Sequence, residues 1–189
     1  MKALLLFSGG LDSMLLAEQL LKDDGMELAV VHYRYPHPAA PREYEAVARW
    51  LVAHPVERYW VSLPIAAPQM DIGVGTPGPR VVPHRNLVML SQAVHLADTI
   101  GAKRVYIGCN HSDEHAYVDC RRGYLIALNS LIEASDIQVV APLINQSKHD
   151  ILAAARELGL SGWWSCYQPD GTRPCGTCNS CLEVDKCNA

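Results

Sequence analysis

The first residues constrain the fold more than any other part of the chain. Residues 2–7, KALLLF, form a short and nearly uninterrupted apolar run. Such a run is typical of a strand that is buried on both faces of a parallel sheet. It ends at the turn SGG, and residues 12–25 then place leucines at helical spacing up to Gly25, where we expect a helix to stop. The chain therefore begins as a strand, a glycine-rich loop and a helix.

The same alternation continues along the chain. Strands are predicted over 27–33, 57–63, 103–109 and 137–143, and helices over 42–54, 86–101, 121–135 and 147–159. This pattern predicts an α/β fold, a Rossmann-like doubly wound parallel sheet with helices on both faces. We expect residues 1–162 to form this domain. Residues 163–189 are rich in cysteine and poor in aliphatic side chains, so we expect them to form a small C-terminal zinc-binding segment packed on it.

Residues 64–83 interrupt the alternation. They are rich in proline and glycine, which disfavours regular structure, and the stretch is long for an internal loop. We interpret it as a lid or a substrate-facing loop.

The loop after the first strand has the features of a phosphate-binding site. Backbone N–H groups and a helix N-terminus can surround an anion there, and the glycines permit the tight path. The hydroxyls of Ser8 and Ser13 can donate to phosphate oxygens. Asp12 would repel phosphate unless a magnesium ion lies between them or unless it caps the helix. A plain strand-to-helix turn is the alternative, but the full string SGGLDS favours the anion site.

Four cysteines near the end of the chain have the spacing C-x8-C-x2-C-x2-C; they are Cys166, Cys175, Cys178 and Cys181. Four thiolates around one Zn²⁺ make a closed structural site, and metal binding would supply folding energy to a segment without a core. An iron–sulfur cluster is the alternative. A redox pair is disfavoured because both two-residue spacers share Cys178. We predict one structural zinc ion per chain.

Charge and cysteine usage exclude several classes of protein. The net charge is −4, with 16 basic and 20 acidic residues, so no basic face for nucleic acid is expected. The apolar start is too short for a signal peptide or a membrane span. Seven cysteines, an odd number, fit a metal site in a reducing compartment better than disulfides. These observations predict a cytoplasmic protein that binds neither membrane nor nucleic acid.

Three further motifs narrow the class. They are Val82–Asn86 (VPHRN), Ile107–Arg121 (IGCNHSDEHAYVDCR) and Ala141–Lys148 (APLINQSK). With SGGLDS and the cysteine-rich tail, they resemble the 7-cyano-7-deazaguanine synthases in the same order, over nearly the whole chain from residue 2 to residue 181. That family belongs to the PP-loop, N-type ATP pyrophosphatases, whose loop binds pyrophosphate.

The resemblance implies a fold, a reaction and partners. The fold is the adenine nucleotide alpha hydrolase-like form of the doubly wound sheet. The reaction converts 7-carboxy-7-deazaguanine, with ammonia and ATP as co-substrate, into 7-cyano-7-deazaguanine, a nitrile precursor of queuosine and archaeosine. The usual activated intermediate is an acyl-adenylate, Mg²⁺ is expected with ATP, and a homodimer is typical.

The resemblance also implies site residues. The nucleotide-binding residues are Phe7, Ser8, Gly9, Gly10, Leu11, Asp12 and Ser13; the catalytic residues are Ser8, Asp12, Ser13, Arg85 and Lys148; the substrate-binding residues are Arg85, Asn86, Asn110, Asp113, Tyr117, Asp119 and Arg121.

Each role has a structural alternative. The cations Arg85 and Lys148 can neutralise phosphate or carboxylate, or form surface salt bridges. Asp119 can accept hydrogen bonds from a guanine-like donor edge, or cap a loop. Tyr117 can stack on the heterocycle or simply pack. Cys120 is interpreted as a buried, inert thiol.

Two histidines, His111 and His115, have a spacing suited to a metal ion on a helix. They are expected in a polar loop instead, and no metal role is assigned to them.

One segment departs from the family pattern. After the second strand the chain reads HYRYPHPAAPREYEA in place of a Tyr-Gly-Gln-type motif. A divergent member of the family, or a relative that joins an activated deazaguanine carboxylate to a different amine, is therefore an alternative. A tRNA-directed PP-loop ATP pyrophosphatase is a second alternative, but no basic surface for RNA is evident. A zinc-ribbon binding module with a vestigial nucleotide fold is a third, and the intact SGGLDS argues against it.

Overall fold

A computed structural model describes residues 1–65 and 82–188 of the chain. The proposed lid, residues 64–83, lies almost wholly outside the described residues.

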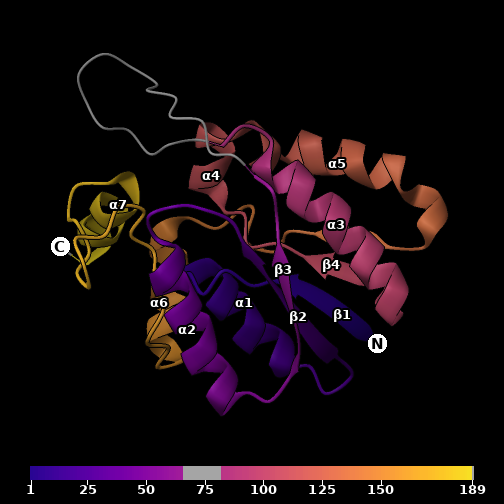
Figure 1. Cartoon of the computed structure of the whole chain (residues 1–189), viewed down its shortest axis with the longest axis horizontal. Helices are drawn as coiled ribbons and strands as arrows, with labels where there is room; N and C mark the ends of the chain where they lie inside the picture. The colour runs from indigo at the N-terminus through magenta and orange to yellow at the C-terminus, as the bar shows by residue number, and fades with distance from the viewer. Residues whose placement is uncertain (66–81, 189) are drawn as a thin grey trace.

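The centre of the fold is a parallel sheet of five strands in the order β3-β2-β1-β4-β5 (Figure 1). The strands are β1 (Lys2–Leu6), β2 (Glu27–Arg34), β3 (Glu57–Ser62), β4 (Arg104–Tyr106) and β5 (Gln138–Val140). In the register of the central strand, Leu4 lies between Ala29 of β2 and Val105 of β4. The strand order reverses beside β1, and ligands of open α/β sheets bind where the order reverses.

The helices are α1 (Leu11–Leu21), α2 (Ala40–Ala53), α3 (Arg85–Ile100), α4 (His111–Ala116), α5 (Arg122–Leu131), α6 (Lys148–Glu157) and α7 (Asn179–Asn188), with short 3₁₀ turns at η1 (Val118–Cys120) and η2 (Glu133–Ser135). All the predicted strands and helices are confirmed within a few residues. The first helix ends at Leu21, before Gly25, because the chain turns at Asp23, whose side chain accepts a hydrogen bond from the Gly25 N–H.

The prediction of a polar loop around His111 is wrong, because residues 111–116 form the helix α4. The Asn110 side chain accepts hydrogen bonds from the N–H groups of Ser112 and Asp113, and the Asp113 carboxylate accepts from the Asn110 N–H. This capping box stabilises a helix too short and too polar for its periodicity to reveal.

The core has two layers, one on each face of the sheet. Ala3 and Leu5 of β1 pack toward α1, α2 and α6, while Leu4 and Leu6 pack toward α3 and α5. Figure 1 shows these two groups of helices on opposite sides of the strands. Both faces of every central strand are therefore buried, and the predicted doubly wound fold is confirmed.

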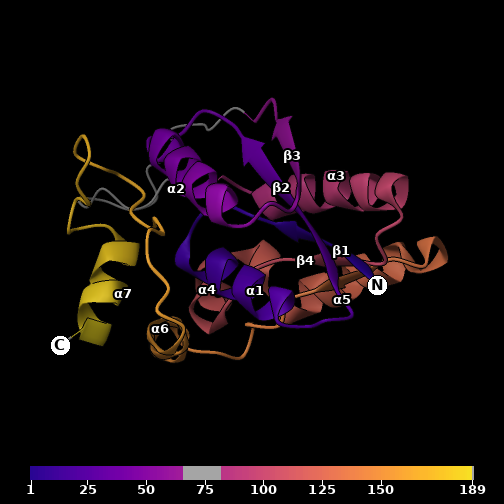
Figure 2. The ribbon, with the colours of Figure 1, turned by 90° about the horizontal axis from the view of Figure 1, so that it is seen from below.

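The C-terminal segment lies beside the main domain. Figure 2 shows α7 next to α6. None of the helices in the described residues is long and apolar enough to cross a membrane.

Candidate active site and cysteine cluster

A cavity of about 200 Å³ lies at the carboxyl end of the central strands. It is lined by the loop after β1, by the ends of β2 and β4, by the start of α3, and by residues of the C-terminal segment. It coincides with the reversal of strand order, the expected position of a ligand site in this fold.

The glycine-rich loop is folded tightly against α2. Gly9 has φ +80°, and a Cβ atom there would lie 2.9 Å from the carbonyl oxygen of Glu43, so only glycine fits this position. The Ser13 hydroxyl donates to the Gly10 carbonyl at 3.0 Å, and the Gly10 N–H donates to the Ser8 Oγ at 3.2 Å. The two serine hydroxyls, 3.2 Å apart, therefore lie together at the start of α1.

Asp12 is held by two partners that are far away in the sequence. The Lys148 ammonium group donates to both of its carboxylate oxygens, at 2.9 and 2.8 Å, and the Asn110 side-chain amide donates at 3.0 Å. Burial opposes the charge on Lys148, but the contact with Asp12 raises the pKa of Lys148 overall. In this arrangement the positive charge of Lys148 compensates the negative charge of the Asp12 carboxylate.

Asp113 adds a second carboxyl group beside this pair. Burial, and then the nearby charge of Asp12, raise the pKa of Asp113 to about 6. Asp113 lines the cavity, whereas Asn110 is buried behind it and holds both Asp12 and the start of α4.

A second cluster that lines the cavity lies around Arg85. Its guanidinium group donates to the Tyr35 hydroxyl at 2.9 Å, and the Tyr35 ring stacks on His37 with 4.4 Å between ring centroids. The His37 Nε2 atom lies 3.5 Å from the Glu43 carboxylate. Burial raises the pKa of Glu43 to about 7, although Arg85 opposes this shift. Burial, together with Arg85, lowers the pKa of His37 to about 4, so this imidazole is neutral at pH 7.

The structure brings most of the predicted site residues together. Phe7, Ser8, Gly10, Leu11, Asp12, Ser13, Arg85, Asn86, Asp113, Tyr117 and Lys148 all line the cavity. Gly9, Asn110, Asp119 and Arg121 are not among the lining residues.

Asp119 and Arg121 have structural partners instead. The Asp119 carboxylate accepts a hydrogen bond from the Asn86 N–H at 2.8 Å, the position of a cap on α3. Arg121 is exposed and donates to the carbonyl of Glu114. The cap is the alternative that the sequence had left open for Asp119.

The Cys120 thiol is buried and accepts a hydrogen bond from the Asn86 side chain at 3.1 Å. It lines the cavity beside Cys109, a thiol whose pKa is raised by its hydrogen bond to Cys120 and by burial. The burial of Cys120 agrees with the prediction of a buried thiol, and its lack of reactivity stays a prediction.

Sequence reasoning missed several lining residues. The most important are Tyr35 and Glu43, which follow β2, together with Trp164, Tyr167 and Glu183 from the C-terminal segment. Trp164 and Tyr167 flank Ser165 and Cys166 in the cysteine-rich tail, whose pattern predicts metal ligands and not cavity residues, whereas Tyr35, Glu43 and Glu183 belong to no motif.

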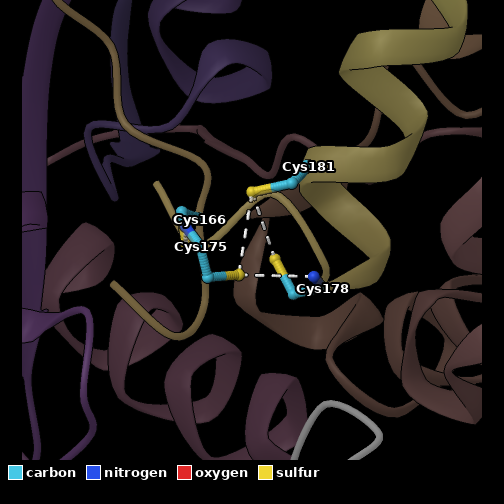
Figure 3. Close-up of side chains that lie close together, drawn as sticks. All are labelled: Cys166, Cys175, Cys178 and Cys181. Carbon is cyan, nitrogen blue, oxygen red and sulfur yellow. Dashed lines mark hydrogen bonds between the residues drawn. The ribbon is translucent and has the colours of Figure 1, made fainter. Parts of the chain in front are cut away.

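The four cysteines of the tail converge, as Figure 3 shows. Their Sγ atoms all lie within 4.8 Å of one another. Sulfur atoms that bind one zinc ion at about 2.3 Å in a tetrahedron are roughly 3.8 Å apart, so the four residues fit such an ion. The N–H groups of Thr177 and Cys178 point at the Cys175 sulfur and lower its pKa to about 6, which favours the thiolate that a metal ion needs.

The cysteine cluster is connected directly to the glycine-rich loop. The Trp164 N–H donates to the Gly9 carbonyl at 2.9 Å, and its indole N–H donates to the Cys166 carbonyl at 2.8 Å. The residues beside the cysteines, among them Ser165 and Ser180, line the cavity. A change in the structure of the cysteine cluster would therefore also change the wall of the cavity.

Several solved structures have a fold similar to that of this chain. The U34-tRNA thiolase NcsA from Methanococcus maripaludis matches with a TM-score of 0.63 and 14% identity, over 100% of this chain and 63% of that protein. The NH3-dependent NAD synthetase from Campylobacter jejuni matches with a TM-score of 0.55 and 16% identity, over 84% of this chain and 64% of that protein. At these identities the likeness concerns the fold alone.

Sequence comparison is more specific. The 7-cyano-7-deazaguanine synthase of Nitratiruptor sp. is 34% identical over 202 residues, which cover 96% of this chain and 90% of that protein. The enzyme of Chlorobaculum tepidum with the same name is 35% identical over 203 residues, covering 96% and 88%. The predicted resemblance is thereby confirmed. The model of the family described as queuosine biosynthesis protein QueC matches residues 2–187, and the chain belongs to this family.

Proposed function

We propose that this protein is an ATP-dependent ligase that converts 7-carboxy-7-deazaguanine and ammonia into 7-cyano-7-deazaguanine. One observation carries the proposal beyond family membership. A single cavity is lined by the glycine-rich loop, by Lys148 beside Asp12, and by Arg85. An anion-binding loop and two cations in one cavity suit a reaction that joins a triphosphate to a carboxylate.

The chemistry requires two activations. ATP first converts the carboxylate into a mixed anhydride, and ammonia attacks it to give an amide. A second activation of the amide oxygen, followed by its loss, leaves the nitrile. Each step needs a phosphate leaving group whose charge is stabilised in place.

We assign roles to the residues of the cavity. The N–H groups at the start of α1, with the hydroxyls of Ser8 and Ser13, bind the phosphates of ATP. Lys148 stabilises their negative charge and keeps Asp12 from repelling them. When Mg²⁺ is bound, it would neutralise further phosphate charge, and Asp12 is the adjacent carboxylate ligand.

The residues around Arg85 would bind the carboxylate substrate. The Arg85 guanidinium group is oriented by Tyr35 and can hold a carboxylate with two hydrogen bonds. Tyr117 and Asn86 line the same part of the cavity and would contact the heterocycle. Asp119 and Arg121 would act through the position of α3 and α5, since they contact those helices.

We propose that the four cysteines hold one structural zinc ion. Four sulfur ligands make a closed site, and zinc would supply the folding energy that the tail lacks. The likeness to NcsA, whose structure is described with a 4Fe–4S cluster, keeps iron as the second candidate. Metal analysis of the purified protein and its visible absorption spectrum separate the two, because only the cluster absorbs visible light.

The remaining partners are also proposals. The net charge of −4 supports a protein that does not bind nucleic acid, and free cysteines support a reducing compartment such as the cytoplasm. A homodimer is proposed from the family alone and is tested by light scattering.

Product analysis tests the function. The protein is incubated with ATP, 7-carboxy-7-deazaguanine and ammonium, and the products are identified by mass spectrometry. We expect the amide first and the nitrile later, and neither without ammonium. ATP turnover that yields no nitrogen-containing product would overturn the proposal. A product formed only with another amine, or only with tRNA, would favour one of the alternative functions.

A further inference from the structure

Glu43 is a carboxyl group in the cavity that no sequence motif singled out. It lies in the first turn of α2, and its own backbone carbonyl oxygen lies against Gly9 of the glycine-rich loop. Its side chain lines the cavity with Arg85. Glu43 is therefore adjacent to the place where the activated carboxylate would form.

The other cavity carboxylates near the loop already have partners. Asp12 accepts two hydrogen bonds from Lys148, and Asp113 accepts the Asn110 N–H at the start of α4. Glu183 lies on the same side as this group, near Lys148 and Asp113. The nearest partner of the Glu43 carboxylate is instead the His37 ring, whose Nε2 atom lies 3.5 Å away.

The surroundings of Glu43 suit a group that changes its protonation during turnover. Tyr35 and His37 face it from the segment after β2, and Arg85 faces it from α3. The imidazole of His37 is neutral, and Arg85 is the one cation among these three neighbours. Burial nevertheless keeps the pKa of Glu43 near neutrality, where a carboxyl group can both take and release a proton.

The reaction needs such a group. In neutral solution ammonia is present almost entirely as ammonium, which has no lone pair for attack. Attack on the activated carboxyl carbon forms a C–N bond, breaks the bond to the phosphate oxygen, and releases one proton from nitrogen. A base beside the glycine-rich loop can take one proton from ammonium before attack. The second proton, which nitrogen releases after attack, leaves to solvent.

Resting on the proposed function, we propose that Glu43 is the catalytic base that deprotonates ammonium for attack on the activated carboxylate. His37 and Arg85 position its carboxylate. The transfer is balanced: ammonium and the Glu43 carboxylate become ammonia and the protonated acid, which is deprotonated again before the next attack.

A change of nucleophile tests this role. Hydroxylamine is a much weaker base than ammonia, so it is unprotonated at neutral pH and needs no base to attack. With wild-type protein, ATP and 7-carboxy-7-deazaguanine, we expect amide from ammonium and hydroxamate from hydroxylamine. With Glu43→Gln, we expect amide formation to fall by about 100-fold, a usual contribution of a general base. Hydroxamate formation should stay within about fivefold of wild type.

The pH profile gives a second readout. Free ammonia becomes more abundant as pH rises, so the gap between Glu43→Gln and wild type should narrow between about pH 7 and about pH 9. Glu43→Asp keeps a carboxyl group and should retain more amide formation than Glu43→Gln. The control is Glu45→Gln, because Glu45 is exposed on the same helix and pairs with Arg42.

The outcomes separate the two proposals. Equal losses of amide and hydroxamate in a folded Glu43→Gln variant would overturn the role of Glu43, since they would indicate a defect in binding or activation. A gap that stays constant with pH would overturn it too. If wild-type protein formed neither product, the proposed function would itself be wrong, and the role of Glu43 would fall with it.

Discussion

The Lys148 ammonium group donates hydrogen bonds to both carboxylate oxygens of Asp12, across 136 residues of sequence. The sequence predicts that Asp12 and Lys148 both belong to the site, but it does not predict that they form an ion pair. The pair compensates the charge of an aspartate in the first turn of α1, the helix at which we propose that phosphate binds.

Replacing Lys148 with methionine leaves the negative charge of Asp12 uncompensated and should lower both ATP affinity and stability. We expect the affinity for ATP to fall at least tenfold, because a cation is lost and a carboxylate is left to repel the phosphates. The free energy of unfolding should fall by about 3 kcal/mol, since a largely buried charge loses its partner. Isothermal titration calorimetry and urea denaturation measure the two effects.

The matched control is Lys103→Met, which removes an exposed salt bridge to Asp136 and should cost less than about 1 kcal/mol. The double variant Asp12→Asn/Lys148→Met should recover most of the lost stability. ATP binding by Lys148→Met as tight as that of wild type would contradict the assigned role.

Gly9 and Gly101 allow backbone strain to be separated from crowding. Both have positive φ, +80° and +74°, but an added Cβ at Gly9 meets the Glu43 carbonyl at 2.9 Å, whereas at Gly101 it meets nothing within 4 Å. Gly101→Ala should therefore cost about 1 kcal/mol for the left-handed conformation alone. Gly9→Ala should cost at least about 2 kcal/mol more and should also weaken ATP binding, because the loop must shift away from α2. Equal losses of stability in urea denaturation would contradict the crowding that the structure places at Gly9.

If the four cysteines hold a metal ion, as proposed, its removal should also affect the glycine-rich loop. Trp164 joins Gly9 to Cys166 through two hydrogen bonds, so disorder of the tail removes one wall of the cavity. We expect Cys178→Ser to lose the metal ion, to weaken ATP binding at least tenfold, and to change tryptophan fluorescence. Cys187→Ser is the control, because Cys187 is not one of the four clustered cysteines. An unchanged ATP affinity in metal-free protein whose core stays folded would show that the two sites are independent.

The sequence predicted the scaffold well for a physical reason. Buried parallel strands such as KALLLF and amphipathic helices carry their periodicity locally, and the cysteines of the candidate metal site, such as Cys175 and Cys178, are separated by short spacers. Each of these features can be read within a window of about one element.

The parts that could not be predicted depend on contacts between distant segments. The sequence motif favours a substrate-binding role for Asp119 but does not reveal that its carboxylate accepts a hydrogen bond from the Asn86 N–H at the start of α3. Glu43 lies near Glu45 on α2, and no motif in the sequence singles it out. Only the packing of α2 against the glycine-rich loop gives it a place in the cavity.

The burial of Glu43 has a consequence for stability that can be measured without substrate. Its pKa is about 7 in the folded protein, against an ordinary value of 4.5 in an unfolded chain. Between these values the folded state holds a proton that the unfolded state has released, so the stabilising contribution is present at low pH and is lost as pH rises through about 7. Glu43→Gln cannot titrate and lacks this loss.

The unfolding free energy of Glu43→Gln, relative to wild type, should therefore rise between pH 5 and pH 8, by about 2 kcal/mol. Urea denaturation at a series of pH values measures this difference. The control Glu45→Gln removes an exposed carboxylate of the same helix, so its difference from wild type should stay flat over the same range. A flat profile for Glu43→Gln as well would mean that Glu43 is ionised in the folded protein at pH 5. Its carboxylate would then be solvated rather than enclosed by Arg85, His37 and the glycine-rich loop.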